Sequence, residues 1–239
     1  MKQLLKTLIR ATGYDLHRHT PSSSHASQLS FALLNHNIDL VFDVGANTGQ
    51  FGRVLRANGY NSTIVSFEPL SEAHAKLLHQ ASTDKAWHIF ERCAIGDFTG
   101  SVDINIAGNS VSSSLLPMLE AHSSAASGSA YVGQERTAIW TLDAIAESYL
   151  ARCHNPFIKI DTQGFEWQVL DGAPNTLRHA RGVLVELSLV PLYKGQYLLR
   201  DMIERLEQLG FSLFCIQPGF TDPRSGQTLQ VDGVFFRES

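Results

Sequence analysis

Two short segments of this sequence combine carboxylic acids with glycines in a pattern that could bind a nucleotide-type ligand. The first is V-F-D-V-G-A-N-T-G-Q-F, residues 41–51, and the second is K-I-D-T-Q-G-F-E, residues 159–166. Glycine adopts backbone angles that other residues avoid, so a ligand can come close to the main chain there. The carboxylates can accept hydrogen bonds or a proton. These segments are therefore the candidate binding and catalytic centres.

The first segment reads as a strand, a tight turn and a helix. Asp43 ends an apolar run, and helical spacing begins at Phe51. Between them, Gly45 and Gly49 flank Asn47, one of the few residue types besides glycine that tolerate positive φ. A turn of this kind marks the nucleotide site of an open α/β sheet. A tight turn that binds no ligand is the alternative for this segment alone.

The turn does not match the common phosphate-binding loops. A Walker A loop needs Lys after its last glycine, but Gln50 stands at that glycine position and no Lys follows. The dinucleotide fingerprint G-x-G-x-x-G also fails, because Asn47 and Gln50 replace its second and third glycines. A nicotinamide-dependent oxidoreductase is therefore disfavoured. It remains an alternative, as does a non-catalytic binding subunit.

An acid follows at the distance expected for ribose recognition. Residues 63–68, T-I-V-S-F-E, form a buried-strand pattern that ends at Glu68, and Pro69 stops the strand. Glu68 lies 19 residues after Gly49. In nucleotide-binding α/β folds, an acid near this place accepts hydrogen bonds from ribose hydroxyls. The pairing of turn and acid strengthens the prediction of a nucleotide site.

In the second segment, an apolar strand carries Lys159 and ends at Asp161. A lysine among apolar neighbours is costly unless a carboxylate pairs with it, and Asp161 or Glu186 could supply one. The carboxyl ends of parallel strands face one crevice. We therefore expect Asp161 near the first turn, as the candidate base, with Glu166 as second choice. The alternatives are a helix cap for Asp161 and a favourable helix-dipole position for Glu166.

The D-x-G-x-N-x-G spacing resembles the first motif of S-adenosylmethionine-dependent methyltransferases. Together with the K-x-D-x-x-G-x-E pattern, it resembles the FkbM family, over about residues 38–239. The resemblance implies a Rossmann-like α/β fold, with a mainly parallel seven-stranded sheet, helices on both faces and an antiparallel C-terminal pair of strands. It also implies S-adenosylmethionine as cofactor and O-methylation of a hydroxyl on a sugar or natural product.

The resemblance supplies the candidate site residues. Those for cofactor binding are Asp43, Gly45, Ala46, Asn47, Gly49, Phe51, Glu68, Pro69, Ala94 and Asp97. The catalytic candidates are Asp161, Lys159 and Glu166. Ala94 and Asp97 belong to residues 87–97, which resemble a third strand and its exit loop. For Asp97, a simple Gly-Asp turn into the next strand is the alternative. Magnesium is an alternative, because Asp161 and Glu166 are carboxylates near one crevice. No triad of metal ligands is readable, however, so no metal is predicted.

The rest of the chain suggests one catalytic domain. We expect a helix and a Ser-rich linker in residues 1–30, with residues 20–30 as the linker, and a methyltransferase domain in 31–239. The first helix has one apolar face that should pack on the domain or, as the alternative, contact a membrane surface or a partner. Residues 183–189, 211–216 and 231–237 read as strands.

Composition narrows the partners. The net charge is −4 and the pI is near 6.2, without a basic patch, so a small-molecule or glycan acceptor is favoured over nucleic acid. The three cysteines form no C-x-x-C pair, which indicates neither a disulfide framework nor zinc and fits the cytoplasm. No signal peptide or transmembrane segment is predicted. The sequence does not indicate the oligomeric state.

A long segment, residues 107–134, shows no regular pattern. Its Ser, Gly and Ala content predicts a mobile lid over the site or a flexible spacer. Residues 112–114 are three serines that resemble a serine-rich string of the FkbM family. Their hydroxyls could address substrate or cofactor.

Overall fold

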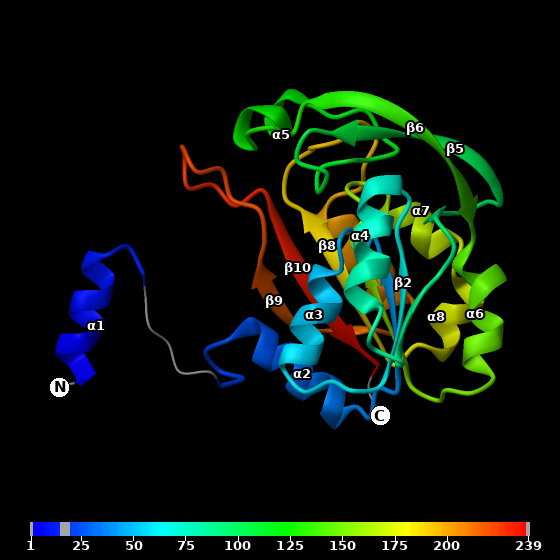
Figure 1. Cartoon of the computed structure of the whole chain (residues 1–239), viewed down its shortest axis with the longest axis horizontal. Coiled ribbons are helices and arrows are strands. Elements are labelled where there is room, and N and C mark those ends of the chain that lie inside the picture. Colours follow the sequence, from blue (N-terminus) through cyan, green and yellow to red (C-terminus); the bar gives the residue numbers. More distant parts are fainter. Residues whose placement is uncertain (1, 15–19, 238–239) are drawn as a thin grey trace.

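A seven-stranded sheet forms the centre of the computed structural model, which describes residues 2–14 and 20–237 (Figure 1). The strand order is β3-β2-β1-β7-β8-β10-β9. The strands are β1 Leu40–Val44, β2 Thr63–Phe67, β3 Trp87–Ile89, β7 Pro156–Ile160, β8 Gly182–Ser188, β9 Ser212–Pro218 and β10 Gln230–Phe236. The first five in this order run parallel, and β10 is antiparallel to β8 and β9. The predicted antiparallel C-terminal pair is confirmed.

Helices cover both faces of this sheet, because strands of a buried parallel sheet present apolar side chains on each side. Val41 of β1 packs with residues of α2, α3 and α4, whereas Phe42 packs with residues of α6, α7, α8 and α9. The covering helices are α2 His25–Asn35, α3 Gln50–Ala57, α4 Ser71–Ala81, α6 Leu142–Leu150, α7 Glu166–Asp171, α8 Pro174–His179 and α9 Leu199–Gln208. The predicted Rossmann-like architecture is therefore confirmed.

A second, three-stranded sheet lies above the carboxyl ends of the parallel strands (Figure 1). It consists of β4 (Cys93–Ile95), β6 (Tyr131–Trp140) and β5 (Gly100–Ala107), in that order. The expectation for residues 87–97 was thus partly wrong, because this segment supplies β3 to the large sheet and β4 to the small one. The small sheet therefore covers the edge of the large sheet at which the sequence predicted a nucleotide site.

The segment 107–134 is not structureless. It contains the short helix α5 (Glu120–Ala125), a bridge between Asn105 and Ser114, and the start of β6. The three serines at 112–114 are buried. Backbone pairing and burial therefore hold this segment in place, although its composition resembles that of a loop.

The N-terminal region also differs from expectation. Residues 25–30 belong to α2, which Ser24 caps by accepting a hydrogen bond from the Ser27 N–H. Leu29 and Leu33 of α2 are buried in the core, so the prediction of a linker over residues 20–30 was wrong from residue 25 onward. We infer that the catalytic domain begins at α2.

The predicted first helix is present as α1 (Lys2–Ala11). The structure does not describe the side chains of Leu4, Leu5 and Leu8, so the packing of the apolar face of α1 remains a prediction.

Candidate active site

A cavity of about 640 Å³ opens at the carboxyl edge of the large sheet, on the face covered by α2 and α3. This volume falls within the usual range of small-molecule sites, about 300–1,000 Å³. Nine predicted site residues line it: Gly45, Ala46, Asn47, Phe51, Glu68, Pro69, Ala94, Lys159 and Asp161. Four others, namely Asp43, Gly49, Asp97 and Glu166, do not line it.

The turn after β1 has the backbone geometry that its sequence predicted. Gly45, Asn47 and Gly49 all have positive φ, at 74°, 46° and 87°. The N–H groups of Gly45 and Ala46 donate to the carbonyl oxygen of Phe67, which ties the turn to the end of β2. A Cβ on Gly45 would overlap the backbone of Asp161, so only glycine fits there.

Glu68 stands at the end of β2, with its carboxylate against this turn. It accepts hydrogen bonds from the Asn47 N–H at 2.7 Å and from the Leu70 N–H at 2.8 Å. Burial raises the pKa of Glu68 to about 7, although both backbone hydrogen bonds favour the charged form. Glu68 is therefore a cavity-lining acceptor that also holds the turn, a second role that the sequence did not reveal.

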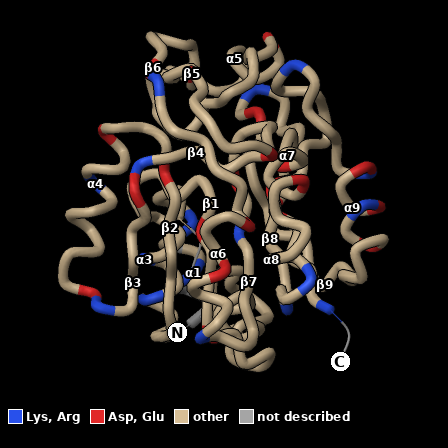
Figure 2. The backbone as a smooth tube through the Cα atoms, turned by 90° about the vertical axis from the view of Figure 1, so that its right-hand side faces the viewer, with Lys and Arg blue, Asp and Glu red and all other residues tan. Residues whose placement is uncertain are grey.

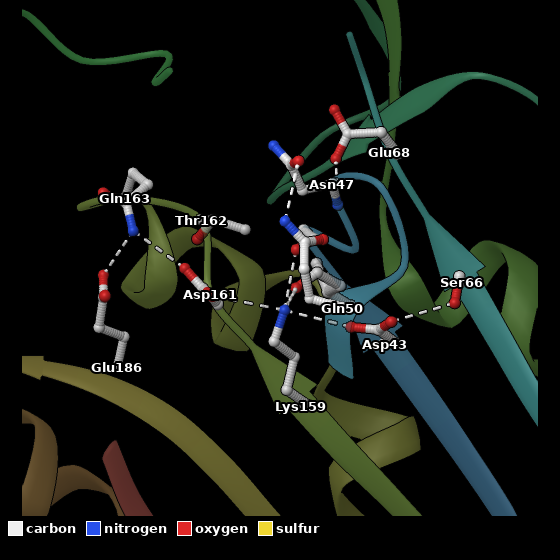
Figure 3. Close-up of polar contacts among 12 residues, drawn as sticks. Asp43, Asn47, Gln50, Ser66, Glu68, Lys159, Asp161, Thr162, Gln163 and Glu186 are labelled. Carbon is white, nitrogen blue, oxygen red and sulfur yellow. Dashed lines mark hydrogen bonds and ion pairs between the residues drawn. The ribbon is translucent and has the colours of Figure 1, made fainter. Parts of the chain in front are cut away.

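Lys159 is the centre of a buried ionic cluster. Its Nζ lies 3.1 Å from Asp43 Oδ1 and 3.5 Å from Asp161 Oδ2, and it donates to the Gly45 carbonyl oxygen at 2.8 Å (Figure 3). Burial alone would lower the pKa of Lys159, but the carboxylates of Asp43 and Asp161 raise it above its usual value. Asp161 was one of the two expected partners. The other, Glu186, does not pair with Lys159.

Asp43 does not line the cavity, and its ion pair with Lys159 links it to the site. Its Oδ2 accepts from the Ser66 hydroxyl at 3.1 Å, and that hydroxyl accepts from the Trp87 indole N–H at 2.9 Å. Asp43 is fully buried and is the register partner of Lys159 on the neighbouring strand. Its position supports a role in fixing Lys159 more than direct contact with a cofactor.

Glu166 does not line the cavity and instead holds the turn that follows β7. Its Oε1 accepts from the N–H and the hydroxyl of Thr162 and from the Gly164 N–H, at 2.9, 3.1 and 3.1 Å. Burial raises the pKa of Glu166 to about 7. This geometry favours the helix-start alternative over a catalytic role.

Asp97 is exposed beyond the end of β4. From this segment, Cys93, Ala94 and Ile95 line the cavity instead. The turn alternative therefore suits Asp97, whereas Ala94 lies where a cofactor contact was expected.

The cavity is also lined by two acids that the sequence analysis did not place there. Glu186 of β8 and Asp232 of β10 are register partners on adjacent strands. Burial, together with the negative charge of Asp161, raises the pKa of Asp232 to about 6 and that of Glu186 well above its usual value. The sequence signal that could have pointed to these two residues is an acid within an otherwise apolar strand. Strand order was needed to bring the two together.

The serine segment covers the cavity from above. Ser112 and Ser113 line the cavity, but the Ser113 hydroxyl accepts from the Ala107 N–H at 2.9 Å. The Ser114 hydroxyl donates to the Gln163 carbonyl oxygen at 2.7 Å. Ser112 Oγ lies 3.0 Å from Nε2 of His122, which is buried on α5. These hydroxyls serve mainly to fix the cover over the site.

Within residues 2–14 and 20–237, no three His, Cys, Asp or Glu side chains gather in a way that could hold a metal ion. In the same part of the chain, no helix is both long and apolar enough to span a bilayer.

The strand order, the antiparallel β10 between β8 and β9, and the Gly-rich turn after β1 define a Rossmann-like methyltransferase fold. The sequence model of the FkbM methyltransferase domain matches residues 43–213. The chain therefore belongs to the FkbM methyltransferase family, as its motifs predicted. No curated protein sequence matches it.

Solved methyltransferases are among the structurally similar proteins. Magnesium protoporphyrin IX methyltransferase from Synechocystis PCC 6803, solved with bound SAM, is 10% identical with a TM-score of 0.48, over 90% of this chain and 77% of that one. The 1,6-didemethyltoxoflavin-N1-methyltransferase from Burkholderia thailandensis, solved with S-adenosylhomocysteine, is 11% identical with a TM-score of 0.48, over 89% and 77%. Neither similarity bears on the acceptor.

Proposed function

We propose that this protein transfers the methyl group of S-adenosylmethionine to a hydroxyl of a sugar or natural product. The observation that carries the proposal is the buried carboxylate of Glu68 on the cavity wall, beside the Gly45 turn, in a member of a methyltransferase family. Nucleotide-type ligands bind where such an acid faces such a turn.

The residues present fit this cofactor. Glu68 would accept hydrogen bonds from the ribose hydroxyls, and the small side chain of Ala46 leaves the backbone of the turn open to the ligand. Phe51 and Ile95 supply apolar wall. When bound, the cofactor supplies a methyl group on a sulfonium, which is a strong electrophile.

The protein's own chemical task is then to orient the acceptor hydroxyl and to take its proton. Asp161 is suited to both, because its side chain is 38% exposed at the cavity and its two oxygens contact Lys159 and Gln163. A carboxylate held in this way is an oriented base. Lys159, whose Nζ lies 3.5 Å from Asp161 Oδ2, helps to hold this carboxylate in place.

We expect a small-molecule or glycan acceptor rather than a nucleic acid, because acids on the described cavity wall, among them Glu186 and Asp232, would repel phosphates. Basic and acidic positions are interspersed along α9, as Figure 2 shows, so this helix offers no basic stripe for a nucleic acid. The three cysteines are free, which supports the expectation of a reducing compartment such as the cytoplasm.

Calorimetry with S-adenosylhomocysteine and with NAD tests the cofactor. We expect binding of the first only, and tight NAD binding without S-adenosylhomocysteine binding would overturn the proposal. Methyl transfer from tritiated S-adenosylmethionine to a panel of methyl glycosides and hydroxylated natural products tests the acceptor class. With an acceptor that the wild type methylates, the Asp161→Asn variant should turn over about 10²–10⁴-fold more slowly, while its cofactor affinity stays within a few fold. Loss of cofactor binding alone would make Asp161 a binding residue.

A further inference from the structure

Gln163 connects two carboxylates that come from neighbouring strands. Its Nε2 donates to Asp161 Oδ1 at 3.0 Å and to Glu186 Oε2 at 2.9 Å (Figure 3). An amide nitrogen has two hydrogens, so both are used. Gln163, Asp161 and Glu186 all line the cavity.

The rest of the protein fixes this amide in one orientation. Its Oε1 lies 2.9 Å from the hydroxyl of Tyr193, which is fully buried and also lies 3.0 Å from the Ser112 carbonyl oxygen. In this arrangement the amide oxygen faces Tyr193, whose hydroxyl hydrogen is shared between two acceptors, and the amide nitrogen faces the two acids. Interchanging oxygen and nitrogen would set the amide oxygen against two carboxylates.

The backbone of Gln163 is also held in an unusual conformation. Its φ is 55°, in the left-handed region that a residue with a Cβ seldom adopts. The Ser114 hydroxyl donates to its carbonyl oxygen at 2.7 Å, and Gly164 follows with a φ of 97°. Such strain persists where the surroundings determine the conformation, and it concentrates at functional sites.

The charges around this bridge explain why a neutral donor is needed. Of the two bridged carboxylates, Lys159 pairs with Asp161, at 3.5 Å, and it pairs more closely with Asp43, at 3.1 Å. Glu186 has the negative charges of Asp161, Glu166 and Asp232 around it, and its donors are the side chains of Gln163 and Gln230. Like charges in one site disfavour ionisation unless hydrogen bonds favour it.

We propose that Gln163 is a positioning residue, whose amide ties the base Asp161 to Glu186 so that both carboxylates face the acceptor as one oriented pair. The role of Asp161 in this statement rests on the proposed function. The bridge itself rests on the contacts above, and it can be tested without any ligand.

The ligand-free test follows the Glu186 carboxyl by ¹³C NMR as the pH is raised, with Glu186→Gln used for assignment. Gln163→Leu keeps the size of the side chain and removes the donor. Because Gln163 favours the charged form, this variant should bind a proton at Glu186 about tenfold more tightly. Gln163→Glu, which adds a carboxyl group instead of a donor, should move the midpoint in the same direction. An unchanged Glu186 midpoint in folded Gln163→Leu would overturn the proposal.

Turnover measurements show whether Gln163 acts on the reaction through Asp161 or only through Glu186. With a methyl glycoside that accepts methyl groups, Gln163→Leu should lower kcat about 10- to 100-fold and leave the KM for S-adenosylmethionine within about threefold. Added to Asp161→Asn, it should cause little further loss. Gln230→Leu removes donors to Glu186 and Ser188 but none to Asp161, so its loss of turnover should add in full to that of Asp161→Asn. Additive loss for Gln163→Leu would contradict positioning through Asp161. Failure of the wild type to bind S-adenosylhomocysteine would sink the methyltransferase proposal but leave the NMR result to decide the bridge.

Discussion

Gly45 and Asp161 meet so closely that a Cβ on the glycine would overlap the carbonyl oxygen of the aspartate. The contact joins the ends of β1 and β7, which are neighbouring parallel strands, and the Asp161 N–H donates to the Val44 carbonyl oxygen at 3.2 Å. The proposed cofactor turn and the proposed base are thus parts of one rigid unit. A change that moves the backbone of either should disturb the other, whereas a change of the Asp161 side chain alone should not.

Gly45→Ala should therefore be severely destabilising. It adds a backbone overlap to the cost of positive φ, and we expect a loss of more than about 4 kcal/mol in the free energy of unfolding. Gly59 is the matched control, because its φ is 88° but an added Cβ would meet nothing within 4 Å. Gly59→Ala should cost only about 1–2 kcal/mol. Urea unfolding measures both, and similar losses would show that the contact with Asp161 does not matter.

Lys159→Met should also destabilise the fold. It leaves the buried carboxylate of Asp43 without its cation, a change that typically costs about 3–5 kcal/mol. Lys76 offers a control, because its ion pair with Glu72 lies on the exposed side of α4. Lys76→Met should change stability by less than about 0.5 kcal/mol. A mild effect of Lys159→Met in chemical denaturation would mean that Asp43 finds another partner or takes up a proton.

Cofactor affinity should depend on pH through Glu68. The carboxyl group has a pKa near 7 in the free protein, and ribose hydroxyls that donate to it favour the charged form. Binding below pH 7 therefore releases a proton, and the dissociation constant of S-adenosylhomocysteine should rise as the pH falls from 7.5 to 5.5, by at most about tenfold per pH unit. Calorimetry in buffers of different ionisation enthalpy reports the proton directly.

Glu68→Gln should remove most of this pH dependence, whereas Glu72→Gln, on the exposed face of α4, should keep it. Glu68→Ala should weaken binding by about 1–3 kcal/mol. It should also lower stability, because the N–H groups of Asn47 and Leu70 lose their acceptor. Wild-type affinity and pH dependence in folded Glu68→Gln would exclude contact between Glu68 and the ribose.

Without ligand, the free energy of unfolding should fall as the pH rises, because of Glu166. Its pKa is raised to about 7 in the folded protein, so the native state binds more protons than the unfolded state between about pH 4.5 and 7. The stability that this group contributes is complete below about pH 4.5 and is lost as the pH rises through 7, by at most about 1.4 kcal/mol per pH unit. Glu166→Gln should remove that slope.

The comparison must be a difference between variant and wild type, because other groups also contribute to the slope: the raised pKa values of Glu68 and Asp232 act in the same sense as that of Glu166, and His122 acts in the opposite sense. Burial lowers the pKa of His122, so that its contribution is lost as the pH falls. Urea titrations at pH 5 and 8 give the two slopes. Equal slopes in both proteins would mean that Glu166 is ionised throughout this range.

Hydrogen exchange should show a narrower lid than the composition of residues 107–134 indicated. The Ser113 and Ser114 N–H groups donate to the carbonyl oxygens of Ser110 and Asn105, so they should exchange slowly without ligand. Cofactor should slow exchange mainly over residues 109–111, which line the cavity and include the half-exposed Val111. Uniform fast exchange over the whole segment would restore the idea of one mobile lid.

The sequence by itself determined the elements whose information is local. The turn between Asp43 and Gly49 was readable because strand spacing, positive-φ residues and helical spacing follow one another within a few residues. Glu68 was readable for the same reason, since an acid and Pro69 end an apolar run. The K-x-D pattern likewise placed Lys159 and Asp161 on one face of a strand, because side chains two residues apart in a strand point the same way.

Only the tertiary structure decided which distant residues share the site. Asp43, Lys159, Glu186 and Asp232 come from β1, β7, β8 and β10, and strand order sets them side by side on one face of the sheet. The tertiary structure also showed that Glu166 does not line the cavity, because its carboxylate accepts hydrogen bonds from the neighbouring Thr162 and Gly164 N–H groups. It showed as well that α2 packs into the core. Side-chain spacing along a strand fixes a face, but the neighbours across that face depend on how the whole chain is threaded through the sheet.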